Sequence, residues 1–301
     1  QQLAPFNLEK PLWVVVSSRV ATSLTTKEGK IEANDMVQVL SFIDKVLSSR
    51  SEAIAAIRTL LNEGLVAQGC VNYLHGRFDY LKQLRESPEN LYINMLEEVF
   101  HSSGGRLYLE NITGVQGEIA LRAGEAGTPF GVINIGEPAK LLSLCEDHGL
   151  LVQDARFGAS LFNDINKPNS RVNLLLGSRK FTEGWSSWRV SNMTLMNVGK
   201  SEGAQIIQLF GRGVRLKGWN TTLKRSADIA TELKLHNVER PKHISVLETL
   251  NIFGLNADYI DQFRKQLEDE DIPVNEGIVE VALPLKPMPN LPQDLSIIRV
   301  K

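Results

Sequence analysis

The sequence predicts an α/β fold built on a parallel sheet with helices on both faces. Two short apolar runs, 12–16 and 172–176, are typical of strands that are buried on both faces of a parallel sheet. Between such runs, apolar residues recur every three or four positions, which is the spacing of amphipathic helices. Strand and helix signals then alternate along the chain, and this alternation favours a parallel sheet covered on both sides.

The first elements lie before residue 65. Strand 12–16 ends at Ser17, and the apolar spacing from 31 to 62 predicts two successive helices. The second of these helices is expected to end at Gly64, because glycine is a common C-terminal stop.

The middle of the chain combines a helix with three strand-like runs. Ser87 is a typical N-cap and Pro88 fits the first helical position, so we expect a helix up to about Phe100. The strand-like runs follow at 106–110, 117–121 and 130–135, separated by glycine-rich turns. We interpret residues 104–128, approximately, as a strand-rich insertion.

The alternation continues after residue 137. A helix is expected from Pro138 to the stop at Gly149, and another from about Glu202. Further strands are predicted at 150–152, 172–176 and 193–198.

The pattern changes after Pro241. There we expect one strand over 245–252 and one acidic helix over 257–271. The chain is therefore divided into a main lobe, 1–240, and the start of a small C-terminal α/β extension, 241–301.

Composition excludes several classes of protein. The 301 residues are 43% hydrophobic and 23% charged, as in an ordinary globular protein, and no apolar run approaches the roughly 18 residues that span a bilayer. A net charge of −2 leaves only local basic patches to argue for nucleic acid. Two cysteines and five histidines without ligand spacing predict no metal site. We expect a cytoplasmic protein. No signal peptide is visible, and because the chain opens on Gln1 rather than on Met, we also expect a piece of a longer one.

The sharpest feature is segment 208–215, which has the spacing Q-x-x-G-R-x-x-R. On a helix its polar members share one stripe, opposite an apolar side. These members are Gln208, Gly211, Arg212 and Arg215. Gly211 and Gly213 each cost about 1 kcal/mol relative to alanine in a helix, so the pair predicts that something packs closely there. Two arginines alone would favour a solvated basic face, but the glutamine and glycines favour a functional one.

This spacing resembles motif VI of superfamily 2 helicases and translocases. Residues 177–185 are similar to their motif V, and residues 12–18 to the strand of motif IV. With 130–136 and 160–162 in the same order, the chain most resembles the restriction subunit of type III restriction enzymes and related DEAD/DEAH-type bacterial defence helicases. The resemblance covers most of residues 11–270.

The resemblance implies a RecA-like fold, with this chain as the second lobe of the motor. ATP would lie between this lobe and an N-terminal lobe of the same full-length chain, which would carry the phosphate loop and the Mg²⁺ ligands. Arg215 would be the arginine finger on the γ-phosphate, with Arg212 beside it and Gln208 coupling both to the nucleotide or the attacking water.

The resemblance also implies further cofactor-binding residues. Glu183, Gly184 and Gly211 would lie at the nucleotide, although an ordinary strand-to-helix turn also explains the first two. The family often has an Asp or Asn that contacts the ribose at the position of Ser186, so that contact is doubtful here. The segment 199–201 imitates the end of a phosphate loop, but Thr194 stands where that motif needs its first glycine.

Double-stranded DNA is the polymer that the resemblance implies. Ser178 and Ser17 would contact its phosphate backbone, although either hydroxyl could equally be a strand-end cap. Arg179 and Lys180 would form a basic patch, to which Lys224 and Arg225 are possible additions. Two tryptophans, Trp185 and Trp188, could stack on bases or pack in the core, and core packing is favoured.

The predicted function is therefore ATP hydrolysis coupled to DNA helicase or translocase activity in a restriction–modification system. A methyltransferase subunit is a further partner that the resemblance implies, and no membrane is expected. The alternative is a noncatalytic RecA-like scaffold that binds DNA or a partner subunit. The presence of Gln208, Arg212 and Arg215 argues against the scaffold, which would not need them.

Overall fold

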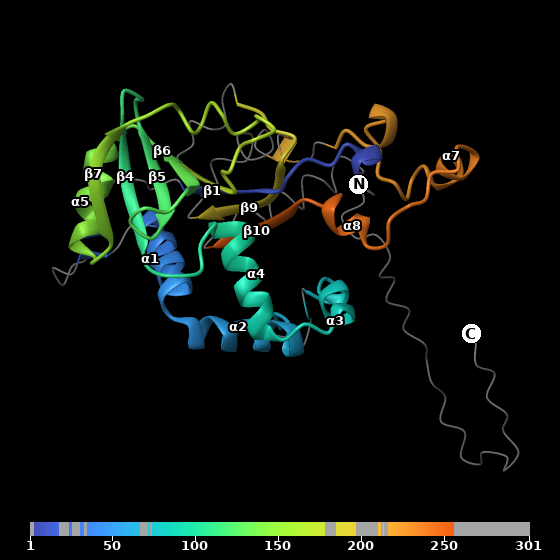
Figure 1. The fold of residues 1–301 in the computed structure, drawn as a ribbon, viewed down its shortest axis with the longest axis horizontal. Coiled ribbons are helices and arrows are strands. Elements are labelled where there is room, and N and C mark those ends of the chain that lie inside the picture. The colour runs from blue at the N-terminus through green and yellow to red at the C-terminus, as the bar shows by residue number, and fades with distance from the viewer. Residues whose placement is uncertain are drawn as a thin grey trace, which may run out of the picture. The chain divides into compact units, whose positions relative to one another are not determined.

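The computed structural model describes these residues: 3–17, 24–25, 31–32, 35–66, 72, 74–177, 185–196, 210–211, 213 and 216–255. Within them, one large sheet carries helices, which confirms the α/β prediction (Figure 1). Two short strands, β2 (Leu24–Thr25) and β3 (Ile31–Glu32), form a separate antiparallel pair.

The large sheet has eight strands. In spatial order they are β10 (Asn251–Leu255), β9 (Val190–Met196), β1 (Leu12–Ser17), β8 (Leu174–Gly177), β6 (Pro129–Asn134), β5 (Glu118–Ala123), β4 (Leu107–Thr113) and β7 (Leu151–Phe157). The predicted strands are present, with bounds that differ by a few residues. Strands β4 and β5, which lie in the expected insertion, are members of this sheet, and their assignment to an insertion stays a prediction.

The sheet is mixed, whereas the sequence predicted a parallel one. Strand β5 runs antiparallel to both β4 and β6, and every other pairing in the sheet is parallel. The connections explain the difference, because only a few residues join β4 to β5 and β5 to β6. Such short turns can join only antiparallel neighbours, since a parallel pair needs a crossover of a dozen residues or more.

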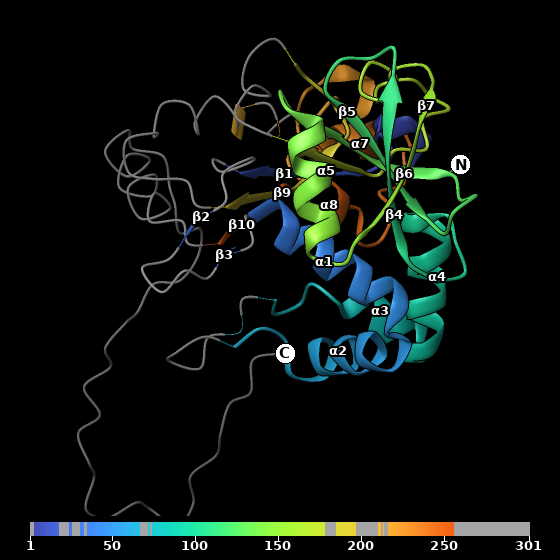
Figure 2. The ribbon, with the colours of Figure 1, turned by 90° about the vertical axis from the view of Figure 1, so that its left-hand side faces the viewer.

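Three helices cover one face of the sheet (Figures 1 and 2). They are α1 (Asp35–Ser48), α4 (Pro88–Phe100) and α5 (Pro138–Asp147). Each buries apolar side chains in one shared core with the sheet, for example Leu40 in α1, Leu96 in α4 and Leu141 in α5. The Ser87 hydroxyl caps α4 by accepting a hydrogen bond from the backbone N–H of Asn90 at 3.1 Å, which confirms the predicted start of this helix.

Two further helices, α2 (Arg50–Glu63) and α3 (Asp79–Leu84), lie in this part of the chain. Helix α2 has no buried residue and ends at Gly64, as predicted. Helix α3 was not predicted, and it too has no buried residue. Ala53, Ile54 and Ile57 of α2 are nevertheless partly buried against the core on this side of the sheet.

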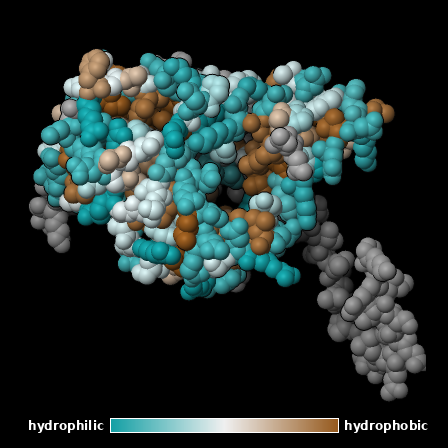
Figure 3. Space-filling view, viewed as in Figure 1, coloured by the Kyte–Doolittle hydropathy of each residue, from teal (hydrophilic) through white to brown (hydrophobic). Residues whose placement is uncertain are grey.

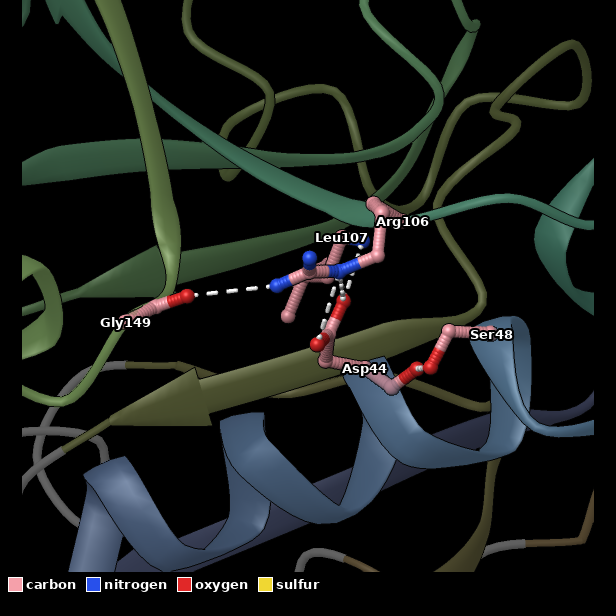
Figure 4. A network of polar contacts seen from close by, with 5 residues as sticks. All are labelled: Asp44, Ser48, Arg106, Leu107 and Gly149. Carbon is pink, nitrogen blue, oxygen red and sulfur yellow. Dashed lines mark hydrogen bonds and ion pairs between the residues drawn. The ribbon is translucent and has the colours of Figure 1, made fainter.

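A polar network fixes α1 to the start of β4 (Figure 4). The Asp44 carboxylate accepts hydrogen bonds from Arg106 Nε at 2.9 Å and from the backbone N–H of Leu107 at 2.8 Å. Arg106 also donates to the carbonyl of Gly149, just before β7. These contacts connect α1 to the start of β4 and to the segment just before β7.

The second face of the sheet has its own core. Val14, Leu175 and Met193 are buried there, and Trp185 and Phe210 pack against the same cluster. Among the described residues this face is covered by segments that include Ile165 and Val172, rather than by a long helix.

The amino ends of β1, β9 and β10 adjoin a small third cluster (Figure 1). It joins Phe6 of the N-terminal turn η1 (Ala4–Phe6) to Ile229, Leu233 and Ile244. The elements nearby are η4 (Trp219–Thr221), α7 (Ala230–Leu235) and α8 (Ile244–Leu247).

The region after Arg240 differs from the prediction. The expected strand over 245–252 is wrong in its first half, which is helix α8, and the strand β10 begins only at Asn251. Because β10 pairs with β9, the large sheet continues across the boundary that we placed at residue 240. Residues Gln1–Phe263 form one compact unit.

Candidate functional site

The strands that precede the predicted motifs end at one edge of the sheet. In the parallel ladder β9–β1–β8, Ser17 is paired with Met196, and Val16 with Gly177. The carboxyl ends of three strands therefore lie side by side. The predicted segment 178–184 follows β8 directly in the sequence. Segment 208–215 begins twelve residues after β9 ends at Met196, and its Gly211 and Gly213 line a cavity at the amino ends of β1 and β9.

Ser17 is the one predicted phosphate-contacting residue that the structure describes. It is buried at the end of β1, and its Oγ donates a hydrogen bond to Asp35 Oδ2 at 2.7 Å. Asp35 is the first residue of α1 and is also buried. The pairing gives Ser17 a structural role as the link between strand and helix, and DNA contact by Ser17 stays a prediction.

Most of the other predicted site residues lie outside the described residues. They are Ser178, Arg179, Lys180, Glu183, Gly184, Gln208, Arg212 and Arg215. Their roles stay predictions. The glycine-lysine-serine segment at 199–201 also lies outside the described residues.

The described part of segment 208–215 agrees with the predicted faces of its helix. Phe210, Gly211 and Gly213 are helical, and Phe210 is buried on the second face of the sheet whereas Gly211 is exposed. A Cβ atom on Gly213 would lie 2.9 Å from Leu250 Cδ2, so close packing is confirmed at this glycine. A Cβ on Gly211 would meet no atom within 4 Å, so close packing within the chain does not explain that one.

The two tryptophans behave differently. Trp185 is buried and stacks on Phe162, with ring centroids 6.2 Å apart, which confirms the favoured core role. Trp188 remains 41% exposed, and the Lys217 ammonium lies 5.7 Å from the centre of its ring. Core packing is therefore wrong for Trp188.

Part of the proposed basic patch lies within the described residues. Lys224 and Arg225 line a cavity at the amino ends of β1 and β9. Arg179 and Lys180, which come soon after Gly177 in the sequence, lie outside the described residues. That these four residues form one patch stays a prediction.

Sequence reasoning missed a buried acid at the carboxyl edge. Glu118, at the start of β5, is paired in the ladder with Asn134 at the end of β6. Its carboxylate accepts hydrogen bonds from the Ser160 hydroxyl and from the backbone N–H groups of Leu161 (2.9 Å) and Phe162 (3.2 Å). Glu118 thus holds the 160–162 segment, which is part of the resemblance described above, beside the sheet edge.

A second missed acid lies further along the sheet. Glu110 of β4, whose side chain is 3% exposed, forms a two-pronged ion pair with Arg122 of β5 at 3.0 and 3.1 Å. Arg156 of β7 approaches the same carboxylate at 3.5 Å. The signal in the sequence is a charge within each of two neighbouring apolar strands, Glu110 in β4 and Arg122 in β5.

Other kinds of chemistry have little support in the described residues. Burial raises the pKa of the Cys145 thiol to about 12, so this thiol is a poor nucleophile at neutral pH. Among the described side chains, no group of three or more His, Cys, Asp or Glu residues is placed to hold a metal ion. The surface seen in Figure 3 is largely hydrophilic and carries only scattered hydrophobic patches.

Comparison with known proteins gives no relative. No family model, curated protein or solved structure matches the chain. In the part of the chain that the structure describes, no helix is long and apolar enough to cross a membrane.

Proposed function

We propose that this chain is the second RecA-like lobe of an ATP-dependent DNA helicase or translocase, similar to the restriction subunit of type III restriction enzymes. The observation that carries the proposal is the shared carboxyl edge of β9, β1 and β8. Ligands of open α/β sheets bind outside the carboxyl ends of the strands. The motif-like segment 178–184 follows β8 at this edge, so the topology supports a ligand site there. Segment 208–215 comes after a longer connection from β9, and its Gly211 and Gly213 line the cavity at the amino ends of the strands.

ATP is the cofactor of the proposed motor, and Gly211 offers one test of whether the chain suits it. This glycine is exposed, and the position of its missing Cβ is open. A bare backbone of this kind allows a phosphate or a second lobe to approach closely. ATP would be held by Glu183, Gly184 and Gly211 on this lobe, with its phosphate loop and Mg²⁺ ligands on the N-terminal lobe.

The arginines would act in phosphoryl transfer by neutralising charge. Arg215 would lie on the γ-phosphate with Arg212 beside it, and Gln208 would position the nucleotide or the attacking water. A guanidinium supplied by one lobe to a nucleotide held by the other acts only when the lobes close. Turnover would thereby become dependent on the bound DNA.

Ser178, Arg179 and Lys180 would contact the phosphate backbone of the DNA. Contacts of this kind are largely independent of base sequence and weaken steeply with salt. Titration of duplex DNA into the chain at two salt concentrations tests them. Binding that is insensitive to salt and specific for one sequence would contradict the proposal.

The split site is tested by ATP turnover. The 301-residue chain alone is expected to hydrolyse no ATP, with or without duplex DNA, whereas a longer protein that includes the N-terminal lobe is expected to do so. Robust hydrolysis by the 301-residue chain, lost on Arg215→Ala, would overturn the shared site. A longer protein that binds DNA without any turnover would favour the noncatalytic scaffold instead.

A further inference from the structure

A cavity of about 610 Å³ lies at the amino ends of β1 and β9, and Gly211 and Gly213 of segment 208–215 line part of it. Its wall includes Pro11 before β1, Trp188 to Ser191 at the start of β9, and Leu250 before β10. The loop after residue 215 closes another side. The volume is within the range of small-molecule sites, about 300–1,000 Å³.

Only some of the charged groups that line the cavity are paired with another group of the protein. Four cations and three carboxylates line it, but two of the cations already have partners. Arg189 is buried and donates to the carbonyls of Lys10, Ile165 and Val172. Lys217 is ion-paired with Glu9.

Lys224 and Arg225 are the cations that remain. Both side chains belong to exposed residues, and neither has an ion-pair partner among the described residues. Of the lining carboxylates, Glu248 accepts hydrogen bonds from the backbone N–H and hydroxyl of Ser226. Asp228 is exposed three residues beyond Arg225. The Lys224 ammonium and the neighbouring Arg225 guanidinium are therefore available to bind an anion.

The loop that carries these cations has a well-defined backbone. Asn220, Thr221 and Leu223 all adopt the left-handed conformation, with φ between 48° and 58°, although none is glycine. Such conformations cost about 1–3 kcal/mol each and persist only where the surroundings impose them. Here the loop is closed by a hydrogen bond from the Leu223 N–H to the Lys217 carbonyl (2.9 Å), and Asn7 Nδ2 donates to the Gly218 carbonyl (2.9 Å).

Trp188 supplies an aromatic surface in the same wall. It is partly exposed, and the Lys217 ammonium near its ring helps to hold it in place. Exposed aromatic rings beside cations are the combination that stacks on bases while the cations bind phosphates. Trp185, three residues earlier, is buried and cannot serve in this way.

We infer that this cavity binds a nucleotide, with its phosphates on Lys224 and Arg225 and its base on Trp188. The inference rests on the proposed function, because Gly211, which is assigned there to ATP, lines this cavity too. It concerns a different edge of the sheet from Ser17 and Gly177, and it needs no second lobe.

Calorimetric titration of ATP into the 301-residue chain tests this site. Lys224→Gln combined with Arg225→Gln should weaken ATP binding by about tenfold or more, because each charge-assisted hydrogen bond supports about that factor. Trp188→Leu should also weaken ATP, but should leave the binding of tripolyphosphate, which has no base, unchanged. The matched control is Arg77→Gln with Lys234→Gln, which removes the same charge from exposed residues outside the cavity lining and should leave both affinities unchanged.

Three results would overturn the inference. They are the absence of saturable ATP binding, an equal loss in the control variant, and binding of a single-stranded oligonucleotide that needs Lys224 and Arg225 while ATP does not bind. The last result would assign the cavity to a nucleic-acid backbone. None of them bears on Arg215, whose role is tested separately by turnover.

Discussion

The hydroxyl of Ser17 donates a 2.7 Å hydrogen bond to Asp35, and both residues are buried where β1 ends and α1 begins. The pair joins the central strand of the ladder β9–β1–β8 to the first helix of the core. A hydroxyl in this position is part of the protein interior. Its loss would therefore change stability whether or not the chain binds DNA.

Ser17→Ala is expected to destabilise the fold by about 1–3 kcal/mol, because it removes a donor from a buried carboxylate. Urea denaturation of the 301-residue chain measures this change. Ser48→Ala is the control, since the exposed Ser48 hydroxyl donates only to the Asp44 carbonyl of its own helix, and it should cost less. Unchanged stability in Ser17→Ala, together with weaker DNA binding, would instead identify Ser17 as a DNA contact.

Arg189→Met should destabilise the protein by on the order of 3 kcal/mol or more. The side chain is buried, and its guanidinium donates to three backbone carbonyls that would lose their partner. Arg58→Met is the comparison, because Arg58 is 55% exposed and paired only with Glu89, so about 1 kcal/mol or less is expected. Equal losses in the two variants would show that Arg189 does not organise the interior.

Glu110→Ala should cost about 3–5 kcal/mol, since it leaves Arg122 without its partner in a largely buried position. The exposed ion pair of Lys45 and Glu52, with both side chains 62% exposed, provides the contrast. Glu52→Ala should change the free energy of unfolding by about 1 kcal/mol or less. Thermal or urea denaturation of both variants distinguishes the two environments, and similar values would contradict the assigned burial.

Gly211→Ala and Gly213→Ala separate packing from function. Alanine is favoured over glycine in a helix by about 1 kcal/mol, and the open surroundings of Gly211 allow that gain. At Gly213 the methyl groups of Leu250 would have to move, and the cost of that movement offsets the gain from alanine. We expect Gly211→Ala to be at least as stable as wild type yet to lower ATP turnover in the two-lobe protein. Full turnover in Gly211→Ala would remove this glycine from the nucleotide site.

The sequence predicted the strands and helices that have a clear periodicity. Helix α4 shows why, because Ser87 and Pro88 define its start by local capping alone. The antiparallel direction of β5 was missed although the short turns around it require that direction. The sequence predicted a strand where helix α8 lies, because apolar residues such as Val246 and Leu247 occur in short strands and in short helices alike.

Some features of the candidate site could be predicted from the sequence, and others could not. The exposure of Gly211 and the burial of Phe210 follow from helical spacing, so they could be predicted. Partners such as Asp35 and Glu118 could not, because Ser17 is 18 residues from the first and Ser160 is 42 residues from the second. Long-range polar pairs depend on tertiary packing, which periodicity does not encode.

The central claim is that Arg215 acts as an arginine finger, and steady-state ATP turnover of the two-lobe protein with duplex DNA tests it most directly. Arg215→Ala should lower kcat by about 10³-fold or more, with a much smaller change in KM and no loss of thermal stability. Arg215→Lys should restore little, because an ammonium does not reproduce the planar guanidinium. Arg77→Ala, which removes the same charge from an exposed residue, should retain wild-type turnover. If Arg215→Ala and Arg77→Ala have the same kcat, or if Arg215→Ala loses activity only in proportion to a lower Tm, Arg215 is not a finger and this chain is not the second lobe of a motor of this kind.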